Sequence, residues 1–464
     1  MTRRTNTLIG ALLCALAGIA TAEVQNTTIR YQYDANGNLK QVTNALNHIT
    51  KYDYDPLNRN TVVTDANNVI TRYSYNALDQ LTQVTDARNL VTTYSIDGLG
   101  NLNQTTSPDT GITINTYDDA GNLKSRTDAK GQTTSYQYDI LNRISKITYA
   151  DASTVTYSYD QGTNGIGRLT QITDSTGTLQ YSYDKQGRLL SDRRTIAGQT
   201  YTTSYRFDTA GRMAGITYPS GRSINFTRDS LGRIASLSST KDGVTQPIVT
   251  QVSYQPFGAA KTITYGNSRT YSRNYDLDGR IASYTLNNQV QSIGYDAASR
   301  ITSINDAGNA VNNSTYGYDN VDRLTSHLKA SSSLNYTYDA VGNRKSQLNG
   351  ATSTTYTYGT TSNRLTNISG SQNSTIVMDA NGSTTNNGSA TFTYDTRGRM
   401  VSANTAIGQV QYQINALGQR IRKATPTAST VFHYDQGGKL IGEVTGTASV
   451  DYVYLEDMLV AVLK

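Results

Sequence analysis

The side chains that could carry acid–base or nucleophilic chemistry are few and lie far apart in the sequence. The histidines are His48, His327 and His433, and a histidine base must lie within hydrogen-bond reach of the group that it deprotonates. The sequence has no Gly-x-Ser-x-Gly elbow, no His-Glu-x-x-His pair and no phosphate-binding loop with its lysine. We therefore interpret the histidines as surface or cross-strand residues, and we expect no catalytic residues and no enzyme activity.

Carboxylates are almost all supplied by aspartate, because glutamate occurs only at Glu23, Glu443 and Glu456. Residues 34–38 (Asp-Ala-Asn-Gly-Asn) and 276–279 (Asp-Leu-Asp-Gly) resemble calcium loops in outline. Neither segment supplies the number of ligands or the downstream bidentate glutamate that such a loop needs. We expect no metal site and no cofactor.

Residues 1–22 are typical of a secretory signal peptide. Arg3 and Arg4 form a positive start, an apolar run covers 8–20, and small residues lead to a cleavage site near Ala22. The apolar run is shorter than the ~20 residues of a membrane-spanning helix. The single cysteine, Cys14, lies in this leader, so the mature chain is expected to have neither a disulfide nor thiol chemistry. The sequence predicts export to an extracellular, cell-surface or periplasmic location.

The aromatic composition is uneven, with 35 Tyr, five Phe and no Trp. A tyrosine can bury its ring while its hydroxyl stays hydrated or hydrogen-bonded. We therefore expect a sheet whose faces are partly exposed to water, and no thick core that excludes water. The formal net charge is +6, but lysine and arginine are spread along the chain without a concentrated patch, so nucleic acid is not an expected partner.

A repeated motif organises the whole mature chain. Tyr-x-Tyr-Asp appears at 31–34 and 52–55 and recurs throughout, and the second aromatic of each copy serves as an anchor, spaced by 21 residues at first and mostly by 20 later. Residues 23–464 are therefore predicted to be about 21 repeats of 20–24 residues. The anchor positions are Tyr33, Tyr54, Tyr75, Ile96, Tyr117, Tyr138, Tyr159, Tyr183, Phe207, Arg228, Tyr254, Tyr275, Tyr295, Tyr318, Tyr338, Tyr358, Met378, Tyr394, Ile414, Tyr434 and Tyr454.

Each repeat has the pattern of a β-hairpin. Alternating Thr and Tyr before the anchor predict a strand, and the aspartate after it opens a turn by accepting from backbone N–H groups. Four residues past the anchor we expect a positive φ. Glycine fills that position in most repeats, Asn58, Asp79, Asn142 and Asp322 fill it in four, and Thr163, Ser299, Ser362 and Met458 break the rule. The glycines are Gly37, Gly100, Gly121, Gly187, Gly211, Gly232, Gly258, Gly279, Gly342, Gly382, Gly398, Gly418 and Gly438.

A second turn is expected half a period after the first. Residues 44–47, 65–68, 86–89 and 128–131 each pair Asn or Asp with Asn or Gly three positions later, so one repeat should contain two strands of roughly seven residues. The fold class is all-β, with tandem antiparallel hairpins. Because twist forces a large sheet to curl, the sheet is expected to wind on itself.

These repeats resemble the YD-repeat or Rhs family, which includes bacterial Rhs proteins, shell subunits of insecticidal toxin complexes and teneurins. The shared pattern Tyr-x-Tyr-Asp-x-x-Gly-(Arg/Asn)-Leu is complete at 31–39 and 181–189, and segments 254–258 and 452–455 also match. The resemblance implies a spiral sheet that forms a hollow shell, which encloses a toxic domain in some members. The family's C-terminal core and self-cleavage site would follow Tyr454, and the sequence stops at Lys464, so we expect an incomplete shell without core or toxin.

Two functions fit this pattern. The first is a secreted, non-catalytic shell or scaffold of Rhs type, truncated or split from a toxin or wall-associated protein. The second is a cell-surface adhesion module whose tyrosine-rich faces bind carbohydrate. The apolar segment 453–463 has nothing after it to cover it, so we expect its edge to pair with a core or toxin chain or with another copy.

Overall fold

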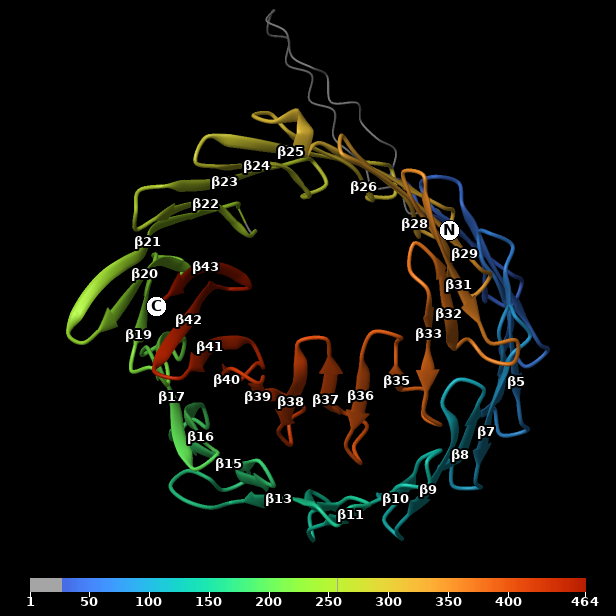
Figure 1. Ribbon diagram of the computed structural model, residues 1–464, viewed down its shortest axis with the longest axis horizontal. Helices are drawn as coiled ribbons and strands as arrows, with labels where there is room; N and C mark the ends of the chain where they lie inside the picture. Colours follow the sequence, from blue (N-terminus) through green and yellow to red (C-terminus); the bar gives the residue numbers. More distant parts are fainter. Residues whose placement is uncertain (1–26, 257) are drawn as a thin grey trace, which may run out of the picture. The chain divides into compact units, whose positions relative to one another are not determined.

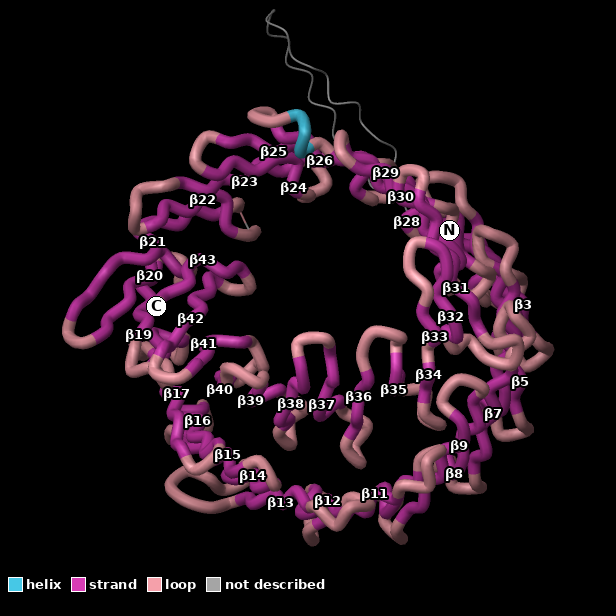
Figure 2. Tube along the Cα trace, viewed as in Figure 1, coloured by secondary structure: helices cyan, strands magenta, loops and turns pink. Residues whose placement is uncertain are grey.

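The computed structural model describes residues 27–256 and 258–464. The predicted signal peptide, with Cys14 and the cleavage site near Ala22, lies outside the described residues. In the described part the chain consists of 43 β-strands and a 3₁₀ helix of three residues, η1 (Ala310–Asn312). Strands and turns alternate along the trace, and η1 follows β26 (Figure 2). The all-β prediction is confirmed: the chain is a long open antiparallel sheet and not a closed barrel.

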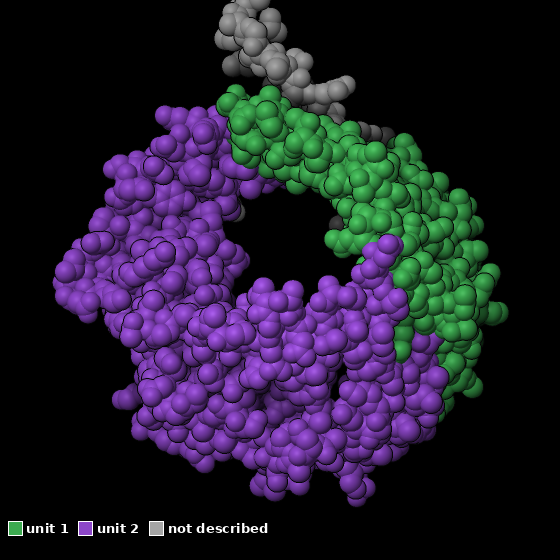
Figure 3. Space-filling view, in the orientation of Figure 1, with its two compact units in different colours: residues 1–96, 291–372 green, residues 97–290, 373–464 purple. Residues whose placement is uncertain are grey.

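Contacts divide the chain into two compact units, which are coloured separately in Figure 3. Unit 1 contains the chain up to Ile96 together with Gln291–Gln372. Its strands are β1 (Arg30–Tyr33), β2 (Leu39–Thr43), β3 (Ile49–Tyr54), β4 (Asn60–Thr64), β5 (Ile70–Tyr75), β6 (Leu81–Thr85), β7 (Val91–Ile96), most of β25 (Gln289–Tyr295), β26 (Ile301–Asp306), β27 (Ser314–Tyr318), β28 (Leu324–Lys329), β29 (Ser332–Tyr338), β30 (Arg344–Asn349), β31 (Thr352–Tyr358) and β32 (Leu365–Gly370).

Unit 2 contains Asp97–Val290 and Asn373–Lys464. Its first segment holds β8 (Leu102–Ser107), β9 (Gly111–Tyr117), β10 (Leu123–Thr127), β11 (Thr133–Tyr138), β12 (Ile144–Thr148), β13 (Thr154–Tyr159), β14 (Leu169–Asp174), β15 (Gly177–Tyr183), β16 (Leu189–Ile196), β17 (Gln199–Phe207), β18 (Met213–Thr217), β19 (Ser223–Arg228), β20 (Ile234–Lys241), β21 (Val244–Tyr254), β22 (Ala260–Tyr265), β23 (Thr270–Tyr275) and β24 (Ile281–Leu286).

The second segment of unit 2 holds β33 (Ser374–Thr375), β34 (Val377–Met378), β35 (Thr384–Asn386), β36 (Thr391–Tyr394), β37 (Met400–Thr405), β38 (Gly408–Ile414), β39 (Arg420–Ala424), β40 (Ser429–Tyr434), β41 (Leu440–Thr445), β42 (Ala448–Leu455) and β43 (Met458–Leu463). Strands β34–β43 form a ten-stranded sheet in chain order. Its last strands lie beside β17–β21 of the same unit (Figure 1).

Strands pair with their neighbours in the sequence, except that β33 and β34 belong to different sheets, and the anchor residue sits at a β-bulge. In the β3–β4 hairpin Tyr54 faces Asn60, whereas Asp53 faces Val62, so Thr61 has no counterpart on β3. A bulge of this type follows a type I turn whose last residue is left-handed. Because the bulge recurs at most anchors, the anchor side chain is presented at the same point of these repeats.

The turn predictions are confirmed at most positions. Twelve of the predicted glycines have a positive φ, and so do Asn58, Asp79, Asn142 and Asp322; the φ of Gly258 involves residue 257 and lies outside the described part. Second turns also end in a left-handed residue, with φ of 62° at Asn47 and 74° at Gly131. These residue types tolerate the left-handed region because they lack a bulky Cβ substituent or bond locally.

Two details of the sequence prediction are wrong. Ser299 does not break the rule, since its φ is 67°. Met458 breaks the rule as predicted: at the last hairpin the left-handed residue is Glu456 (φ 55°), because a two-residue turn replaces the usual longer one. Most strands have five or six residues, and not seven, because two turns and a bulge occupy the remainder of each period.

The expectation of a sheet with partly exposed faces and no thick core holds for unit 1 and fails for unit 2. Among the described residues of unit 1 only Thr43 and Ser314 are buried. In unit 2 a core forms where strands from its two segments meet, and burying each aliphatic side chain stabilises it by about 1.5–3 kcal/mol. The buried members are Leu189, Tyr205, Ile216, Tyr218, Ile224, Leu237, Ile248, Val249, Ala260, Ile263, Ile441, Val453 and Leu455.

The terminal strand β43 is covered on one face by the chain itself. Met458, Val460, Ala461 and Leu463 pack against the core cluster of unit 2. The expectation that nothing covers segment 453–463 is therefore wrong for this face, because the strand folds back onto repeats more than 200 residues earlier. Its outer edge is the end of the ten-stranded sheet.

Candidate functional site

The aspartate after each anchor closes its turn with both carboxylate oxygens. In the β3–β4 hairpin Asp55 Oδ1 accepts from the backbone N–H groups of Leu57 (2.9 Å) and Arg59 (3.0 Å). Its Oδ2 accepts from Arg59 Nε at 2.7 Å. The hydrogen bond from the Arg59 side chain is the main reason that the pKa of Asp55 lies below its usual value. These carboxylates are therefore used in holding the turn.

The arginine of this motif also links one repeat to the next. Arg59 Nη1 donates to the carbonyl oxygen of Asn76 (2.8 Å) and to Asp79 (2.9 Å), both in the following turn. Its guanidinium lies 5.1 Å from the ring centroid of Tyr75, the next anchor, in a cation–π contact. The same arginine-to-next-anchor stacking occurs at Arg143–Tyr159, Arg188–Phe207, Arg233–Tyr254, Arg300–Tyr318 and Arg323–Tyr338.

The anchor hydroxyl explains the preference for tyrosine over phenylalanine. Tyr75 donates to the carbonyl oxygen of Asn60, beside the bulge of the preceding hairpin, at 2.8 Å. Burial raises the pKa of this phenol, so it is a donor and not a base at neutral pH. Equivalent bonds are made by Tyr54, Tyr117, Tyr138, Tyr159, Tyr183, Tyr254, Tyr275, Tyr318, Tyr338, Tyr358, Tyr394, Tyr434 and Tyr454.

The anchor tyrosines do not stack directly on one another. Among the described residues one tyrosine pair is in ring contact, Tyr271 with Tyr284, whose rings are tilted with their centroids 6.0 Å apart. In the repeats named above an arginine lies between successive anchors. The aromatic faces of those anchors are thus occupied by guanidinium groups of the same chain.

In unit 1, repeats far apart in sequence meet turn to turn. Arg88, in a second turn, donates to the carbonyl oxygens of Gly359 (2.6 Å) and Ser362 (2.8 Å) in a later Asp turn. Asn363 Nδ2 donates back to Asp86 at 2.9 Å. The contact therefore joins the second turn of an early repeat to the Asp turn of a late one.

Unit 2 repeats this arrangement. Asn381, in the Asp turn 379–382, donates to Asp128 at 2.6 Å, and Lys130 forms an ion pair with Asp379 at 3.2 Å. Farther along, the guanidinium of Arg397 lies 4.1 Å from the ring centroid of Tyr149. We call the contacts between repeats more than 200 residues apart within one unit the seam; it begins with the second turns at 65–68, 86–89, 128–131 and 149–152 and the later Asp turns that they contact.

The seam becomes buried and ionic near the C-terminus. Arg222 Nε donates to Asp451 Oδ2 at 2.8 Å, and Ser220 donates to the same oxygen at 2.7 Å. The hydroxyl of Tyr218 donates to the carbonyl oxygen of Tyr452 at 2.9 Å. A buried pair of this kind fixes the register of two segments, because removing one partner leaves an uncompensated charge.

A second buried ion pair, between Arg194 and Asp192, lies near His433. Arg194 binds Asp192 through Nε (3.0 Å) and Nη2 (2.5 Å), and its Nη1 donates to Gln419 at 2.7 Å. His433 is 3% exposed, and its ring lies 4.5 Å from that of Tyr201. Among the described residues neither ring nitrogen has a hydrogen-bond partner. Burial, followed by the charge of Arg194, lowers the pKa of His433 to about 4.

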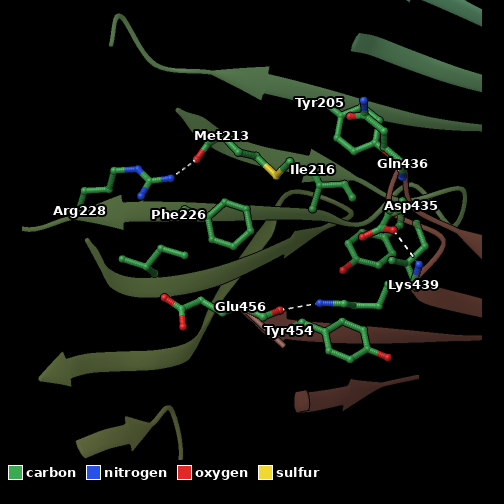
Figure 4. Close-up of a pocket in the computed structure, with 14 residues that line it drawn as sticks. Tyr205, Met213, Ile216, Phe226, Arg228, Asp435, Gln436, Lys439, Tyr454 and Glu456 are labelled. Carbon is green, nitrogen blue, oxygen red and sulfur yellow. Dashed lines mark hydrogen bonds between the residues drawn. The ribbon is translucent and has the colours of Figure 1, made fainter. Parts of the chain in front are cut away.

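A cavity of about 610 Å³ lies in unit 2 between β17–β20 and β40–β43 (Figure 4). Tyr205, Phe226 and Tyr454 supply much of its apolar wall. Arg228 Nη2 donates to the Met213 carbonyl at 2.8 Å, and Lys439 Nζ donates to the Glu456 carbonyl at 2.7 Å. Both cations at this cavity thus donate to backbone carbonyls, and Lys439 also forms an ion pair with Asp457 at 2.8 Å; Asp435 and Glu456 line the same cavity.

Known proteins identify the repeat. The RHS Repeat family matches residues 33–70, 54–89, 75–112 and 117–154, and the Teneurin YD-shell family matches 163–244 and 287–425. The chain belongs to the YD-repeat, or Rhs, family. No curated protein sequence gives a match.

Solved structures share the YD-repeat fold. The chain superposes on the Photorhabdus luminescens Tc holotoxin pore with a TM-score of 0.73 at 17% identity, covering 92% of this chain and 27% of that one. TcdB2–TccC3 without its hypervariable C-terminal region gives 0.76 at 17% identity, with the same coverages. The TcdB2–TccC3–Cdc42 structure gives 0.75 at 18%, covering 92% and 28%. The YD-repeat chain thus spans about a quarter of the solved chains that it matches.

The structure does not bring the three histidines of this YD-repeat chain together. His327 stacks on its cross-strand partner Tyr316 with centroids 4.9 Å apart, and this cross-strand placement was predicted. His48 has a buried Nδ1 beside a second turn, and His433 is in the core. Within residues 27–256 and 258–464 no three His, Cys, Asp or Glu side chains group as a metal site requires.

The two calcium-like segments of the YD-repeat chain are ordinary Asp turns. Asp34 Oδ1 accepts from the N–H groups of Asn36 and Asn38, and Oδ2 accepts from the Asn38 side chain at 2.9 Å. Asp276 is bound in the same way by the backbone and side chain of Arg280. No described helix has the length and hydropathy of a membrane-spanning one.

Sequence reasoning missed the seam. The segment 189–196 gave a signal, since Asp192 and Arg194 share one face of a strand that has aliphatic residues at both ends. Asp451 gave a similar one between valine and tyrosine residues of β42. The sequence did not reveal how many residues separate the two turns that meet at the seam.

Proposed function

We propose that the chain is a secreted, non-catalytic shell protein of Rhs type whose sheet winds as a spiral around a hollow. The observation that carries this proposal is the seam, which ties repeats separated by 225 to 277 residues within each unit. Contacts at such intervals hold distant parts of the sheet against each other, as the wall of a shell requires. The recurrent Asp–Arg–Tyr contacts use the polar groups of each repeat for structure, which favours a scaffold over an enzyme.

The proposed occupant is a polypeptide cargo. The solved structures that share this fold include toxin complexes, named as TcdB2–TccC3. By analogy we propose that a C-terminal Rhs core or toxin chain is the partner of this array. Since the chain covers about a quarter of those proteins, the cargo is supplied either by a longer form of the chain or by a separate one.

Protection from protease tests enclosure. An unstructured reporter peptide is fused after Lys464, and its digestion by trypsin is compared with that of the free reporter. We expect digestion to be slowed severalfold, and we expect Arg222→Met, which breaks the seam pair with Asp451, to abolish the protection. Digestion at the rate of the free reporter in both proteins would refute a hollow that encloses cargo.

The outer edge of β43 is the proposed point of attachment for the partner. Its other edge pairs with β42, and an edge strand presents free backbone groups to a second chain. Val462→Pro in this strand should reduce binding of the gene product encoded next to this protein. If neither that product nor another copy binds the unaltered edge, the attachment fails while enclosure of a fused cargo can still hold.

Export is tested by the N-terminus of the mature protein. We propose cleavage after Ala22, so mass spectrometry of exported protein should find Glu23 as the first residue. Retention of residues 1–22 in material outside the cytoplasm would refute cleavage there.

Binding to carbohydrate is the second candidate. It is favoured by Tyr31 and Tyr33, which lie on one side of β1 and are each about half exposed. Aromatic faces with polar neighbours can stack on sugars. We expect a glycan array or peptidoglycan pull-down to retain the wild-type chain and to lose Tyr31→Ser; retention no greater than for an unrelated β-protein would exclude this function.

A further inference from the structure

The cavity in Figure 4 departs from the repeat at three residues, and the first is Arg228. This arginine occupies an anchor position, where most repeats have a tyrosine. Its Nη2 donates to the carbonyl oxygen of Met213 at 2.8 Å, and Tyr75 makes the same bond to the carbonyl oxygen of Asn60 through its hydroxyl. The guanidinium therefore takes the place of the anchor hydroxyl, and this bond holds it to the backbone.

The second departure is Lys439, in the Asp turn that begins at Asp435. In the usual turn Oδ2 of the aspartate accepts from an arginine or asparagine side chain four residues later. Here Lys439 Nζ donates instead to the carbonyl oxygen of Glu456 and to Asp457. Asp435 Oδ1 still accepts from the backbone N–H of Lys439 at 2.8 Å, but among the described residues no side chain donates to Oδ2. One oxygen of this carboxylate is left for a ligand.

Glu456 is the third departure, because it is the left-handed residue of a two-residue turn. It lines the cavity, and within residues 27–256 and 258–464 its carboxylate takes part in no hydrogen bond or ion pair. The two lining cations have other carboxylates nearby, since Arg228 Nε lies 3.9 Å from Asp208 and Lys439 pairs with Asp457 at 2.8 Å. Residues that break a local pattern are expected at functional sites, and here they leave two carboxylates without an ion pair.

The wall between these carboxylates is aromatic and aliphatic. Figure 4 shows Phe226 and Ile216 between Asp435 on one side and Glu456 on the other. Burial raises the pKa of the Tyr205 phenol, and the charge of Asp435 contributes to the rise, so the field of this carboxylate reaches the wall. An aromatic face attracts an organic cation, and a charge removed from water needs a partner of opposite charge.

We propose that this cavity binds an organic ammonium ion, that is, an apolar body with a positively charged amine. The apolar body contacts Phe226 and the aliphatic wall, and the ammonium group donates to Asp435 Oδ2 or to the Glu456 carboxylate. A volume of about 610 Å³ is in the range of small-molecule sites. A small amine and a basic side chain of a polypeptide offer the same chemistry. The inference does not depend on the enclosure of cargo.

Calorimetric titration of the full-length protein with matched ligands tests the role of charge. 2-Phenylethylammonium has the ring and the charge, whereas 2-phenylethanol has the ring alone. We expect the ammonium ion to bind more tightly than the alcohol by roughly tenfold or more. Equal binding of the two ligands, or no binding of the ammonium ion at millimolar concentration, would overturn the proposal. Competition by a blocked Gly-Lys-Gly peptide would assign the natural ligand to a polypeptide side chain, and no competition would assign it to a small amine.

Variants place the ligand in this cavity. Asp435→Asn removes the charge and keeps the turn, because asparagine closes the equivalent turn at Asn415 through its Oδ1. This variant should bind 2-phenylethylammonium more weakly by roughly tenfold and 2-phenylethanol as the wild type does, and Glu456→Gln should have a smaller effect because Glu456 is exposed. The matched control, Asp118→Asn, makes the same change in a turn outside the cavity and should bind both ligands normally. If both carboxylate variants bind the ammonium ion like the wild type, or if the control loses as much binding as Asp435→Asn with unaltered circular dichroism, the site is refuted.

Discussion

Lowering the pH should weaken unit 2 through His433. At pH 7 this side chain is neutral in both the folded and the unfolded chain. Its ordinary pKa is 6.5, whereas the folded value is about 4, because the ring is buried and faces Arg194. Between these two values the unfolded chain binds a proton that the folded chain does not bind. The free energy of unfolding therefore falls as the pH drops from 6.5 to 4.

The difference between the two pKa values sets the size of the effect. It corresponds to a loss of about 3 kcal/mol, complete below pH 4 and absent above pH 7. The strands concerned are β40, which carries His433, and β16 and β17, which carry Arg194 and Tyr201. Amide hydrogen exchange of peptides from these strands, measured at constant intrinsic exchange rate between pH 7 and pH 4.5, reports their local stability.

A variant isolates the histidine from the many aspartates that also titrate. In His433→Leu the two unpartnered ring nitrogens are replaced by an apolar group, so stability at pH 7 should be equal or higher. The variant should retain the pH dependence caused by the aspartates and lose about 3 kcal/mol of the total fall. If wild type and variant lose the same protection in β16, β17 and β40 on acidification, the reasoning from burial is refuted.

Three further predictions concern the repeat and the seam. Tyr75→Phe removes a hydroxyl-to-carbonyl bond and should lower the free energy of unfolding of unit 1 by about 1 kcal/mol in urea titrations; no change would show that the bond is not needed. Arg222→Met should cost about 3–5 kcal/mol, because Asp451 remains buried and charged, and adding Asp451→Leu should recover most of it; if the double variant is as unstable as the single one, the pair is not the cause. Gly100→Ala, at a φ of 88°, should cost about 1–2 kcal/mol in thermal melts, whereas Gly98→Ala, which meets open space at an ordinary φ, should cost much less.

The local structure was predictable because the residues of each repeat determine its own strands and turns. The left-handed positions follow from Gly, Asn and Asp at a fixed offset from the anchor, and the alternation of Thr and Tyr gives the strands. Ser299 shows the limit, since the neighbouring repeats impose a left-handed φ on a residue that does not favour it. At that position the surrounding hairpins, and not the residue type, decide the turn.

The seam could not be predicted from the period. Nothing in the sequence near Asp192 or Asp451 says which distant repeat will face it, because that depends on the twist and curl accumulated over many strands. The core of unit 2 follows from the same cause, since Ile441 and Val453 become buried only when β41 and β42 reach β16–β22. The residues that distinguish one repeat from another are thus the ones that a search for similarity overlooks.

The strand order also has a consequence for the path of folding. Every described ladder joins consecutive strands, so the first contacts to form have a low contact order, and each hairpin can add to the one before it as the polypeptide emerges. The hydrogen bonds from Arg194 to Gln419 and from Arg222 to the Lys464 carbonyl join residues 225 and 242 positions apart, and the entropy of closing such long loops delays them until late. A pulse-labelled refolding experiment should therefore find hairpins protected from the N-terminal end onward before the two segments of unit 2 lock together.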